Sequence, residues 1–159
     1  MSIHTPKNHQ HCTVCCLPFF NHNTVIHFTL MPDGGVQSKI VPTEKVQGYQ
    51  GVMQGGVITT LHDTAMTHCL FSRHVYAMTA QLDVRFIKPI PLNTAIQVQA
   101  HCLKSKRGVH FLQSSIYVNG QCYSKAEAKF MSRQGMLGGN DTTESLGDHI
   151  SAVPFIRSF

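Results

Sequence analysis

A change in the spacing of apolar residues, close to residue 72, limits most strongly how this chain can fold. From Val57 to about Phe71 the apolar side chains recur at the spacing of an amphipathic helix. Beyond that stretch the spacing becomes two, which is typical of strands with one buried face. A lone helix must bury its apolar stripe against the only other apolar surface on offer, the buried face of the sheet. The stripe consists of Ile58, Leu61, Ala65 and Cys69.

Six strands are predicted around this helix. Before it, Thr24–Leu30 and Val36–Val41 form a hairpin across the turn residues 32–35. After it come strands at 79–87, 94–103, 112–118 and 122–130. We therefore expect an α+β fold in which one curved antiparallel sheet of about six strands wraps one long helix.

Turns and alternation refine this prediction. Asn119-Gly120 is the strongest short signal for a tight hairpin. Another turn is predicted over Lys104, Ser105, Lys106 and Arg107, ending at Gly108. Alternation predicts that Ala80, Leu82, Val84 and Phe86 share the inward face of their strand. Cysteine in an apolar pattern behaves as a small hydrophobe, so three cysteines are predicted to lie in the core: Cys69, Cys102 and Cys122.

The length of 159 residues suits one domain. We predict an N-terminal arm over 1–23, the domain over 24–131, and a C-terminal tail over 132–159 for which we expect mobility. The first residues have no apolar run of the signal-peptide kind, and no segment approaches the roughly 18 apolar residues of a membrane span. These features predict a cytoplasmic protein with no membrane partner.

The balance of charge favours an anionic partner. Lys and Arg number 13 against 8 Asp and Glu, a net charge of +5 with neutral histidines. The basic residues are scattered and tryptophan is absent, whereas a nucleic-acid binder clusters basic residues with aromatic ones. We therefore predict no nucleic-acid partner and favour a small molecule that carries phosphate groups.

The arm is dense in histidine and cysteine. Cys12 and Cys15 have the spacing of zinc ligands, and several histidines lie close by. The alternative is an irregular arm that packs Phe19 and Phe20 on the domain. Because no second ligand pair follows at an ordered spacing, we predict no bound metal.

A motif leads into the helix. It reads Gly48-Tyr49-Gln50-Gly51-Val52-Met53-Gln54-Gly55-Gly56-Val57, followed by Leu61-His62-Asp63-Thr64-Ala65-Met66. Together with residues 83–90 and 126–130, this motif resembles the hotdog-fold acyl-CoA thioesterases of the phenylacetate-pathway and 4-hydroxybenzoyl-CoA thioesterase type. The resemblance implies hydrolysis of the thioester of an acyl- or aryl-CoA to the free acid and CoA, with no further cofactor.

The resemblance also implies catalytic roles. It places the catalytic carboxylate at Asp63, as general base on water or as nucleophile, and a hydroxyl that helps to place the water at Thr79. N–H groups at a helix start have no partner within the helix, so Gly55 is predicted to bind the thioester oxygen. Gln54 stands where many members have histidine, and it can donate a hydrogen bond but cannot carry a proton.

Further residues are predicted to bind the substrate. Gly56 leaves room for the acyl group, while Tyr49 and Met53 suggest an apolar acyl tail. The phosphates of coenzyme A require a basic rim. Its candidates are Lys88, Lys104, Lys106 and Arg107. In the family the helix starts and carboxylates come from different subunits, which implies a homodimer and leaves open a homotetramer.

Alternatives remain open at this stage. A hotdog protein that binds acyl-CoA without hydrolysing it is one of them, because of Gln54. A hotdog dehydratase or hydratase is less favoured, since Asp63 and His68 lie about 140° apart on a helical wheel and the Asn-Pro of that motif is missing. Asp63 could also be a surface residue bonded to Thr59 or Thr67.

Overall fold

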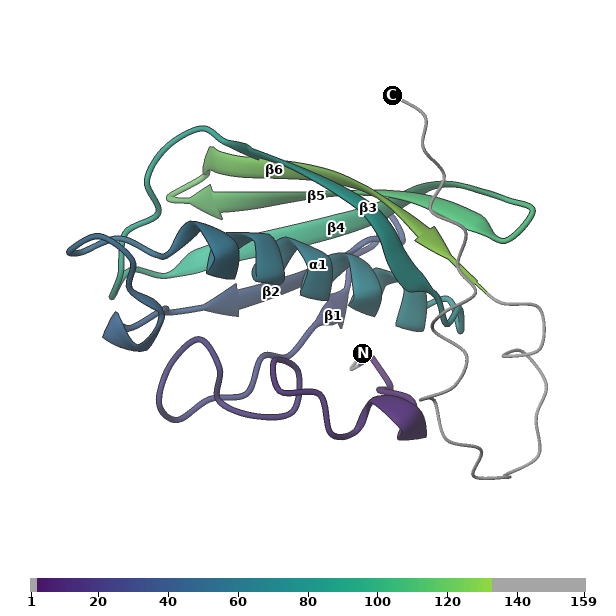
Figure 1. Ribbon diagram of the computed structural model, residues 1–159, viewed down its shortest axis with the longest axis horizontal. Coiled ribbons are helices and arrows are strands. Elements are labelled where there is room, and N and C mark those ends of the chain that lie inside the picture. The colour runs from purple at the N-terminus through teal and green to yellow at the C-terminus, as the bar shows by residue number, and fades with distance from the viewer. Residues whose placement is uncertain (1–2, 133–159) are drawn as a thin grey trace.

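The computed structural model describes residues 3–132 and shows one helix lying across one sheet (Figure 1). Helix α1 spans Gly55–Phe71, and two short 3-10 helices, η1 (Lys7–His9) and η2 (Glu44–Val46), precede it. The strands are β1 (Thr29–Leu30), β2 (Val36–Ile40), β3 (Met78–Phe86), β4 (Ile96–Lys106), β5 (Val109–Val118) and β6 (Gln121–Met131). The predicted hotdog architecture of one helix and six antiparallel strands is confirmed.

The order of strands in the sheet is β1-β2-β4-β5-β6-β3. Helix α1 lies mainly against β4 and β5 in the middle of the sheet. Strand β3 follows α1 in the chain but pairs with β6, and its other edge has no partner strand within residues 3–132. The first strand after the helix is therefore an edge strand that runs beside one flank of α1 (Figure 1).

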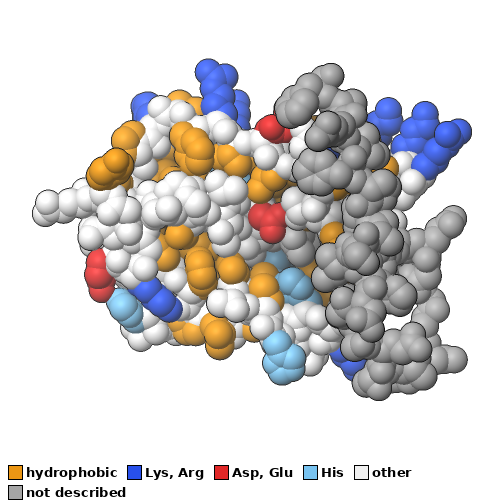
Figure 2. All heavy atoms as spheres, in the orientation of Figure 1, with side chains coloured by type: hydrophobic (Ala, Val, Ile, Leu, Met, Phe, Trp, Pro, Cys, Tyr) orange, Lys and Arg blue, Asp and Glu red, His pale blue; other side chains and the backbone are white. Residues whose placement is uncertain are grey.

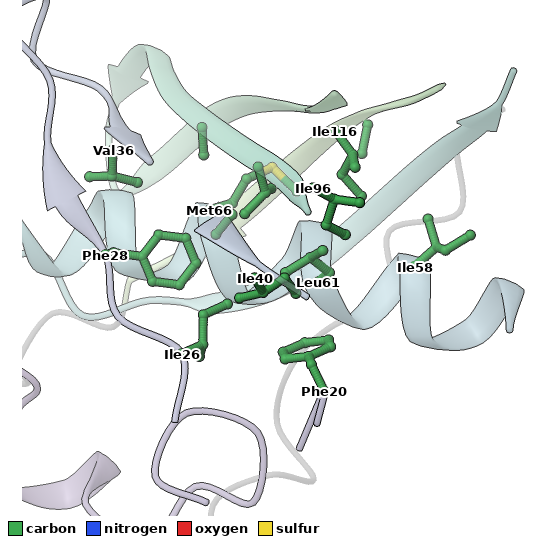
Figure 3. Packing of buried hydrophobic residues seen from close by; sticks show 14 of the residues in the cluster. Phe20, Ile26, Phe28, Val36, Ile40, Ile58, Leu61, Met66, Ile96 and Ile116 are labelled. Atoms are coloured by element: carbon green, nitrogen blue, oxygen red, sulfur yellow. The ribbon is translucent and has the colours of Figure 1, made fainter. Parts of the chain in front are cut away.

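The core fills the space between α1 and the inner face of the sheet. Figure 3 shows aliphatic and aromatic side chains of both layers pointing toward one another. The whole predicted stripe of α1 is buried, and Leu61 and Ala65 are completely enclosed. Burial of a side chain such as Leu61 stabilises the fold by about 1.5–3 kcal/mol. Phe20 of the arm is also buried, so the arm is docked on the domain.

One polar side chain, His62, is completely enclosed between α1 and the sheet. Its Nδ1 contacts the hydroxyl of Ser114, and its Nε2 lies 2.8 Å from Ser124 Oγ. Ser124 Oγ donates to the Arg85 carbonyl at 3.0 Å, so the Nε2–H donates to Ser124 and Ser114 donates to Nδ1. Burial lowers the pKa of His62 to about 4. His62 is therefore neutral at pH 7 and ties α1 to β5 and β6.

The boundaries of two elements differ from the prediction. Only Thr29–Leu30 of the first predicted strand pairs with β2, because Ile26 and Phe28 of the preceding segment pack into the core. Helix α1 begins at Gly55, two residues earlier than predicted, because Gln54 caps it.

The turn between β4 and β5 is shorter than predicted. Strand β4 continues through Lys106, so the predicted turn at 104–107 is wrong and the turn consists of Arg107 and Gly108, with φ of 52° and 78°. The turn predicted at Asn119-Gly120 is confirmed by φ of 48° and 78°.

A β-bulge at Ala80 overturns the predicted facing at the start of β3. Thr79 lies opposite Phe130 on β6, and the next paired residue is Gln81, so Ala80 has no opposite partner. Directly opposite residues of an antiparallel pair point to the same face. Phe130 is completely buried, so Thr79 occupies the inward face that the alternation predicted for Ala80.

A second bulge corrects the prediction for the cysteines. Tyr123 is the extra residue between β5 and β6, and it places Cys122 opposite Tyr117 on the outer face. Cys122 is consequently half-buried and not part of the core. Cys69 is completely buried as predicted, and Cys102 packs half-buried against the core.

Within residues 3–132 no helix is long and apolar enough to cross a membrane. The predicted C-terminal tail lies outside the described residues from residue 133 onward. Location in the cytoplasm and the three-part division of the chain stay predictions.

Candidate active site

The start of α1 leaves two backbone N–H groups free. Gln54 is the N-cap, since its Oε1 accepts from the Val57 N–H at 2.8 Å and its carbonyl accepts from Ile58 at 3.0 Å. The N–H groups of Gly55 and Gly56 have no hydrogen-bond partner among residues 3–132. Both lie at the positive end of the dipole of a 17-residue helix. This geometry suits a developing oxyanion.

A Cβ at position 56 would meet the side chain that caps the helix, whereas one at position 55 would not. A Cβ on Gly56 would lie 2.9 Å from Gln54 Oε1, so the capping side chain would be displaced. A Cβ on Gly55 would meet only the ring of Phe86, at an ordinary 3.8 Å. The missing side chain at Gly55 therefore serves no packing need within the described chain and keeps its N–H open to a ligand.

Asp63 and Thr79 meet across α1 and β3. Thr79 Oγ1 donates to Asp63 Oδ1 at 2.6 Å, a short charge-assisted bond. The bulge at Ala80 makes this contact possible, because it turns Thr79 inward. Asp63 Oδ2 has no hydrogen-bond partner among residues 3–132. Thr59 bonds instead to the Gly55 carbonyl at 3.0 Å, so the alternative of an Asp63–Thr59 bond is not what the structure shows.

The free N–H groups and the carboxylate lie too far apart to act together within one chain. Gly55 and Asp63 are eight positions apart on α1, which is about 12 Å along the helix axis. A reacting carbonyl has to lie about 3 Å from both the oxyanion donor and the nucleophile or base. Within one chain the two groups therefore do not form a single site, and we call them the two candidate half-sites.

Comparison with known proteins bears on the same segment. Residues 50–121 match the family model of the thioesterase superfamily. Mouse acyl-coenzyme A thioesterase THEM4 is 33% identical over 88 residues, which make up 54% of this chain and 38% of that protein. The segment matched by the family model includes the start of α1, Asp63 and Thr79.

Over residues 50–121 this chain is similar to the thioesterase superfamily. A hypothetical thioesterase from Streptococcus pneumoniae, solved with coenzyme A, has a TM-score of 0.63 at 20% identity over 67% of this chain and 86% of its own. Zebrafish thioesterase superfamily member 2 has a TM-score of 0.61 at 17% identity, over 67% and 80%. These likenesses show a shared fold. The chain spans well under half of its curated relatives, 38% of mouse and 30% of rat THEM4.

The predicted substrate-binding residues fall in separate places. Met53 is 4% exposed and belongs to the core, so within one protomer it offers no surface to a substrate. Tyr49 is 89% exposed in the loop before α1. The Lys88 ammonium donates to Gln121 Oε1 at 3.1 Å and lies 5.5 Å from the centre of the Tyr123 ring.

The other basic candidates lie at the far end of the molecule. Lys104 and Lys106 are on β4, and Arg107 is in the turn to β5. Figure 1 shows this hairpin at the end of the sheet opposite to the start of α1. The structure therefore separates these three residues from Gly55 of the same chain.

His68 does not pair with Asp63. It is 4% exposed, and its ring stacks on Phe28 at a centroid distance of 4.6 Å. Neither ring nitrogen has a hydrogen-bond partner among residues 3–132, and burial lowers the pKa of His68 to about 4. The dehydratase alternative, which needs an aspartate and a histidine acting together, gains no support from this arrangement.

The arm reaches the surroundings of Asp63, which the sequence analysis did not predict. Burial lowers the pKa of His9, and the charge of Asp63 partly opposes that effect. Burial also raises the pKa of the Cys15 thiol well above its usual range, with smaller contributions from neighbouring groups that include Asp63. The regular spacing of His9, Cys12 and Cys15, three positions apart, is the one signal in the sequence that points to this cluster.

The half-sites lie on open surface. Surface hollows of about 320 and 230 Å³ occur elsewhere, one on the outer face of the sheet and one near β2, and neither is lined by Gly55 or Asp63. Figure 2 shows the face that carries α1, with hydrophobic side chains exposed among polar ones. On β3, Phe86 is 55% and Met78 45% exposed. A substrate bound at these candidate half-sites would be enclosed only together with a second surface.

Proposed function

We propose that this protein hydrolyses acyl-CoA thioesters, with Asp63 as the catalytic carboxylate and Gly55 as the oxyanion donor. The observation that carries the proposal is the 2.6 Å hydrogen bond from Thr79 to Asp63, on the helix that opens with two free N–H groups. The match of residues 50–121 to the thioesterase superfamily supports it. So do the mouse relative, named an acyl-coenzyme A thioesterase, and the coenzyme A in the Streptococcus structure.

The proposed chemistry follows from the hydrogen-bonding capacity that Thr79 and Asp63 have left. The Thr79 hydroxyl donates its hydrogen bond to Asp63 Oδ1, and its oxygen can still accept one. A water molecule between Thr79 Oγ1 and Asp63 Oδ2 would therefore be held in place by Thr79 and deprotonated by Asp63. Its attack on the thioester carbon places negative charge on the carbonyl oxygen, which the Gly55 N–H binds. Collapse of this intermediate expels the CoA thiolate and leaves the free acid. Direct attack by Asp63 would give an anhydride that water hydrolyses to the same products.

A homodimer would complete the site. The axial separation of about 12 Å between Gly55 and Asp63 requires the two groups to come from different chains. The free edge of β3 and the exposed side chains of Phe86 and Met78 offer a surface for the second chain. A partner's β4–β5 hairpin would then be the source of lysines for the phosphates of coenzyme A.

The test is hydrolysis of a panel of aryl, short-chain and long-chain acyl-CoAs, followed by the absorbance of the thioester itself. Asp63→Asn should lower kcat by roughly a hundredfold or more. Asp83→Asn is the matched control, because Asp83 lies exposed on β3 with only Gln81 as its partner. An equal loss of kcat in both variants would show that Asp63 is not the catalytic carboxylate.

Mixed dimers test the assembly. Gly55→Pro removes the N–H at the first helical position, where proline is tolerated, and Gln54 already has the extended ψ of 137° that precedes proline. Dimers of Asp63→Asn with Gly55→Pro chains contain one intact site only if the two groups come from different chains. Recovered activity in the mixture would establish the shared site, and a mixture as inactive as its parents would refute it.

The second candidate is binding without hydrolysis, and Gln54 favours it. The side-chain oxygen Oε1 of Gln54 already accepts from the Val57 N–H, so within this side chain only the NH₂ group is left for a ligand. A wild-type protein that binds acyl-CoA in calorimetry and turns over no member of the panel would establish this candidate in place of the thioesterase.

A further inference from the structure

Three side chains of the N-terminal arm meet in one cluster. His9 Nε2, Cys12 Sγ and Cys15 Sγ all lie within 4.8 Å of one another, and His9 Nε2 is 3.3 Å from Cys15 Sγ. Ligand atoms around tetrahedral zinc lie roughly 3.5–3.8 Å apart, given Zn–S bonds of about 2.3 Å and Zn–N bonds of about 2.0–2.1 Å. The three atoms are therefore already close to the spacing of three corners of a zinc site.

The backbone of the arm holds this arrangement. Short turns join the segment, with the Cys12 N–H bonded to the His9 carbonyl at 3.2 Å and the Cys16 N–H to the Cys12 carbonyl at 3.0 Å. The His9 ring also meets the edge of Phe71, at the end of α1, with a centroid distance of 5.0 Å. The imidazole is thus oriented from both sides, by the arm and by the helix. Cys15 is 8% exposed, so the cluster lies at the contact of arm and domain.

Neighbouring residues of the same types are excluded from the cluster. The Cys16 thiol donates instead to the His9 carbonyl at 3.4 Å, and His11 is exposed. Among the histidines and cysteines of this segment, only one imidazole and two thiols thus converge, as the ligands of a metal ion do. The sequence analysis predicted no metal because no second ligand pair follows Cys15. The third ligand of this cluster, His9, instead precedes the two cysteines.

We propose that His9, Cys12 and Cys15 bind one Zn²⁺ ion that fastens the arm to the end of α1, with water or another small ligand in the fourth position. Two thiolates and an imidazole are ligands that zinc prefers over magnesium or calcium. Binding releases the protons of both thiols to solvent. The inference is independent of the proposed function, since the ion holds the arm and takes no step in hydrolysis.

The test begins with the wild-type protein, purified under reducing conditions without chelator. We expect about one zinc per chain by elemental analysis. Replacement by Co²⁺ should give the thiolate-to-cobalt charge-transfer band and the intense visible bands of a tetrahedral site, saturating at one equivalent. Zinc far below one per chain, together with no such bands on Co²⁺ addition, would overturn the proposal. A disulfide between Cys12 and Cys15 in the reduced preparation would overturn it as well.

Variants assign the ligands. Cys12→Ser, at a half-buried position, should weaken Co²⁺ binding by at least the roughly 10–100-fold that loss of an outer-shell partner costs. Cys16→Ser and His11→Gln are matched controls from the same segment and should bind Co²⁺ like the wild type. Far-ultraviolet circular dichroism confirms that each variant is folded. A Cys12→Ser protein that is folded and binds with wild-type affinity would refute the assignment.

Discussion

The two sides of helix α1 follow different rules. On the side toward the sheet, Leu61 and Ala65 are completely buried, and both ring nitrogens of His62 have serine partners. On the side toward the edge of β3, Asp63 Oδ2 and the Gly55 N–H have no partner among residues 3–132. Buried polar groups in proteins are nearly always paired, so unpaired ones at a surface indicate where water, a ligand or a second chain supplies the partner. Folding pairs the polar groups of the inner side, except the ring nitrogens of His68, and leaves those of the outer side open.

Acid should disrupt the inner side, with the largest expected effect. His62 and His68 have folded-state pKa values of about 4 against an ordinary 6.5. Below pH 6.5 these two histidines are therefore protonated in the unfolded chain while they stay neutral in the folded chain. The free energy of unfolding should fall between pH 6.5 and pH 4 by about 3 kcal/mol for each histidine, and the contribution is fully present only above pH 6.5.

Chemical denaturation at several pH values measures this loss. His68→Leu replaces a histidine without hydrogen-bond partners among residues 3–132 by an apolar side chain, and should flatten the pH dependence by about one histidine's share. A pH dependence that His68→Leu leaves as steep as in the wild type would show that His68 is not buried in its neutral form.

The outer side should fail differently, in activity and not in stability. Gly55→Pro should lower kcat by about 10²–10³-fold, the cost of losing one oxyanion donor, while the midpoint of thermal unfolding stays close to that of the wild type. Gly55→Ala keeps the N–H and meets only an ordinary contact with Phe86, so it should lose less. If the alanine variant loses as much activity as the proline variant, the N–H has no special part in the reaction.

Replacement of a serine should affect stability more on the inner face of the sheet than on its outer face. Ser114→Ala leaves a nitrogen of His62 unpaired inside the core, and should lower the free energy of unfolding by about 1–3 kcal/mol. Its neighbour Ser115 lies on the opposite face of β5, opposite Lys125, and Ser115→Ala should change stability by less than about 0.5 kcal/mol. Denaturant titration of the two variants decides, and equal stabilities would contradict the inward role of His62.

The smallest effect is expected at Thr79, for which the proposed function implies a positioning role through its hydrogen bond to Asp63. Thr79→Val removes the hydroxyl at nearly constant volume and should lower kcat by roughly tenfold, as loss of a positioning partner does elsewhere. Thr79→Ser restores the hydroxyl and should restore most of kcat, which a purely structural role for the threonine methyl would not allow. Steady-state kinetics of both variants, with KM reported separately, make the distinction.

Some of this site could be read from the chain. Asp63 is off the apolar stripe because of its position in the helical period, and glycines before a helix give free N–H groups wherever they stand. The contact from Thr79 to Asp63 could not be derived from alternation. Alternation turns Ala80 inward, and only the extra residue at the bulge gives that place to Thr79. A bulge is set by pairing with a distant strand, which local periodicity does not contain.

The same limit applies to the other corrections. Cys122 left the core because of the bulge at Tyr123. His9 joined Cys12 and Cys15 through turns of an arm without hydrophobic periodicity. The basic hairpin of β4 and β5 lies at the far end from Gly55, because the direction of β4 is fixed by its place in the sheet.

The sequence by itself determined the helix, the number and succession of strands, the Asn119-Gly120 turn and the side of α1 on which Asp63 lies. These follow from short-range spacing, which local sterics and the separation of apolar from polar residues impose. Only the tertiary structure decided strand order, the bulges and the partner of Asp63. Each of these depends on which residues far apart in the chain come to lie opposite one another, and that is settled by packing the whole sheet around the helix.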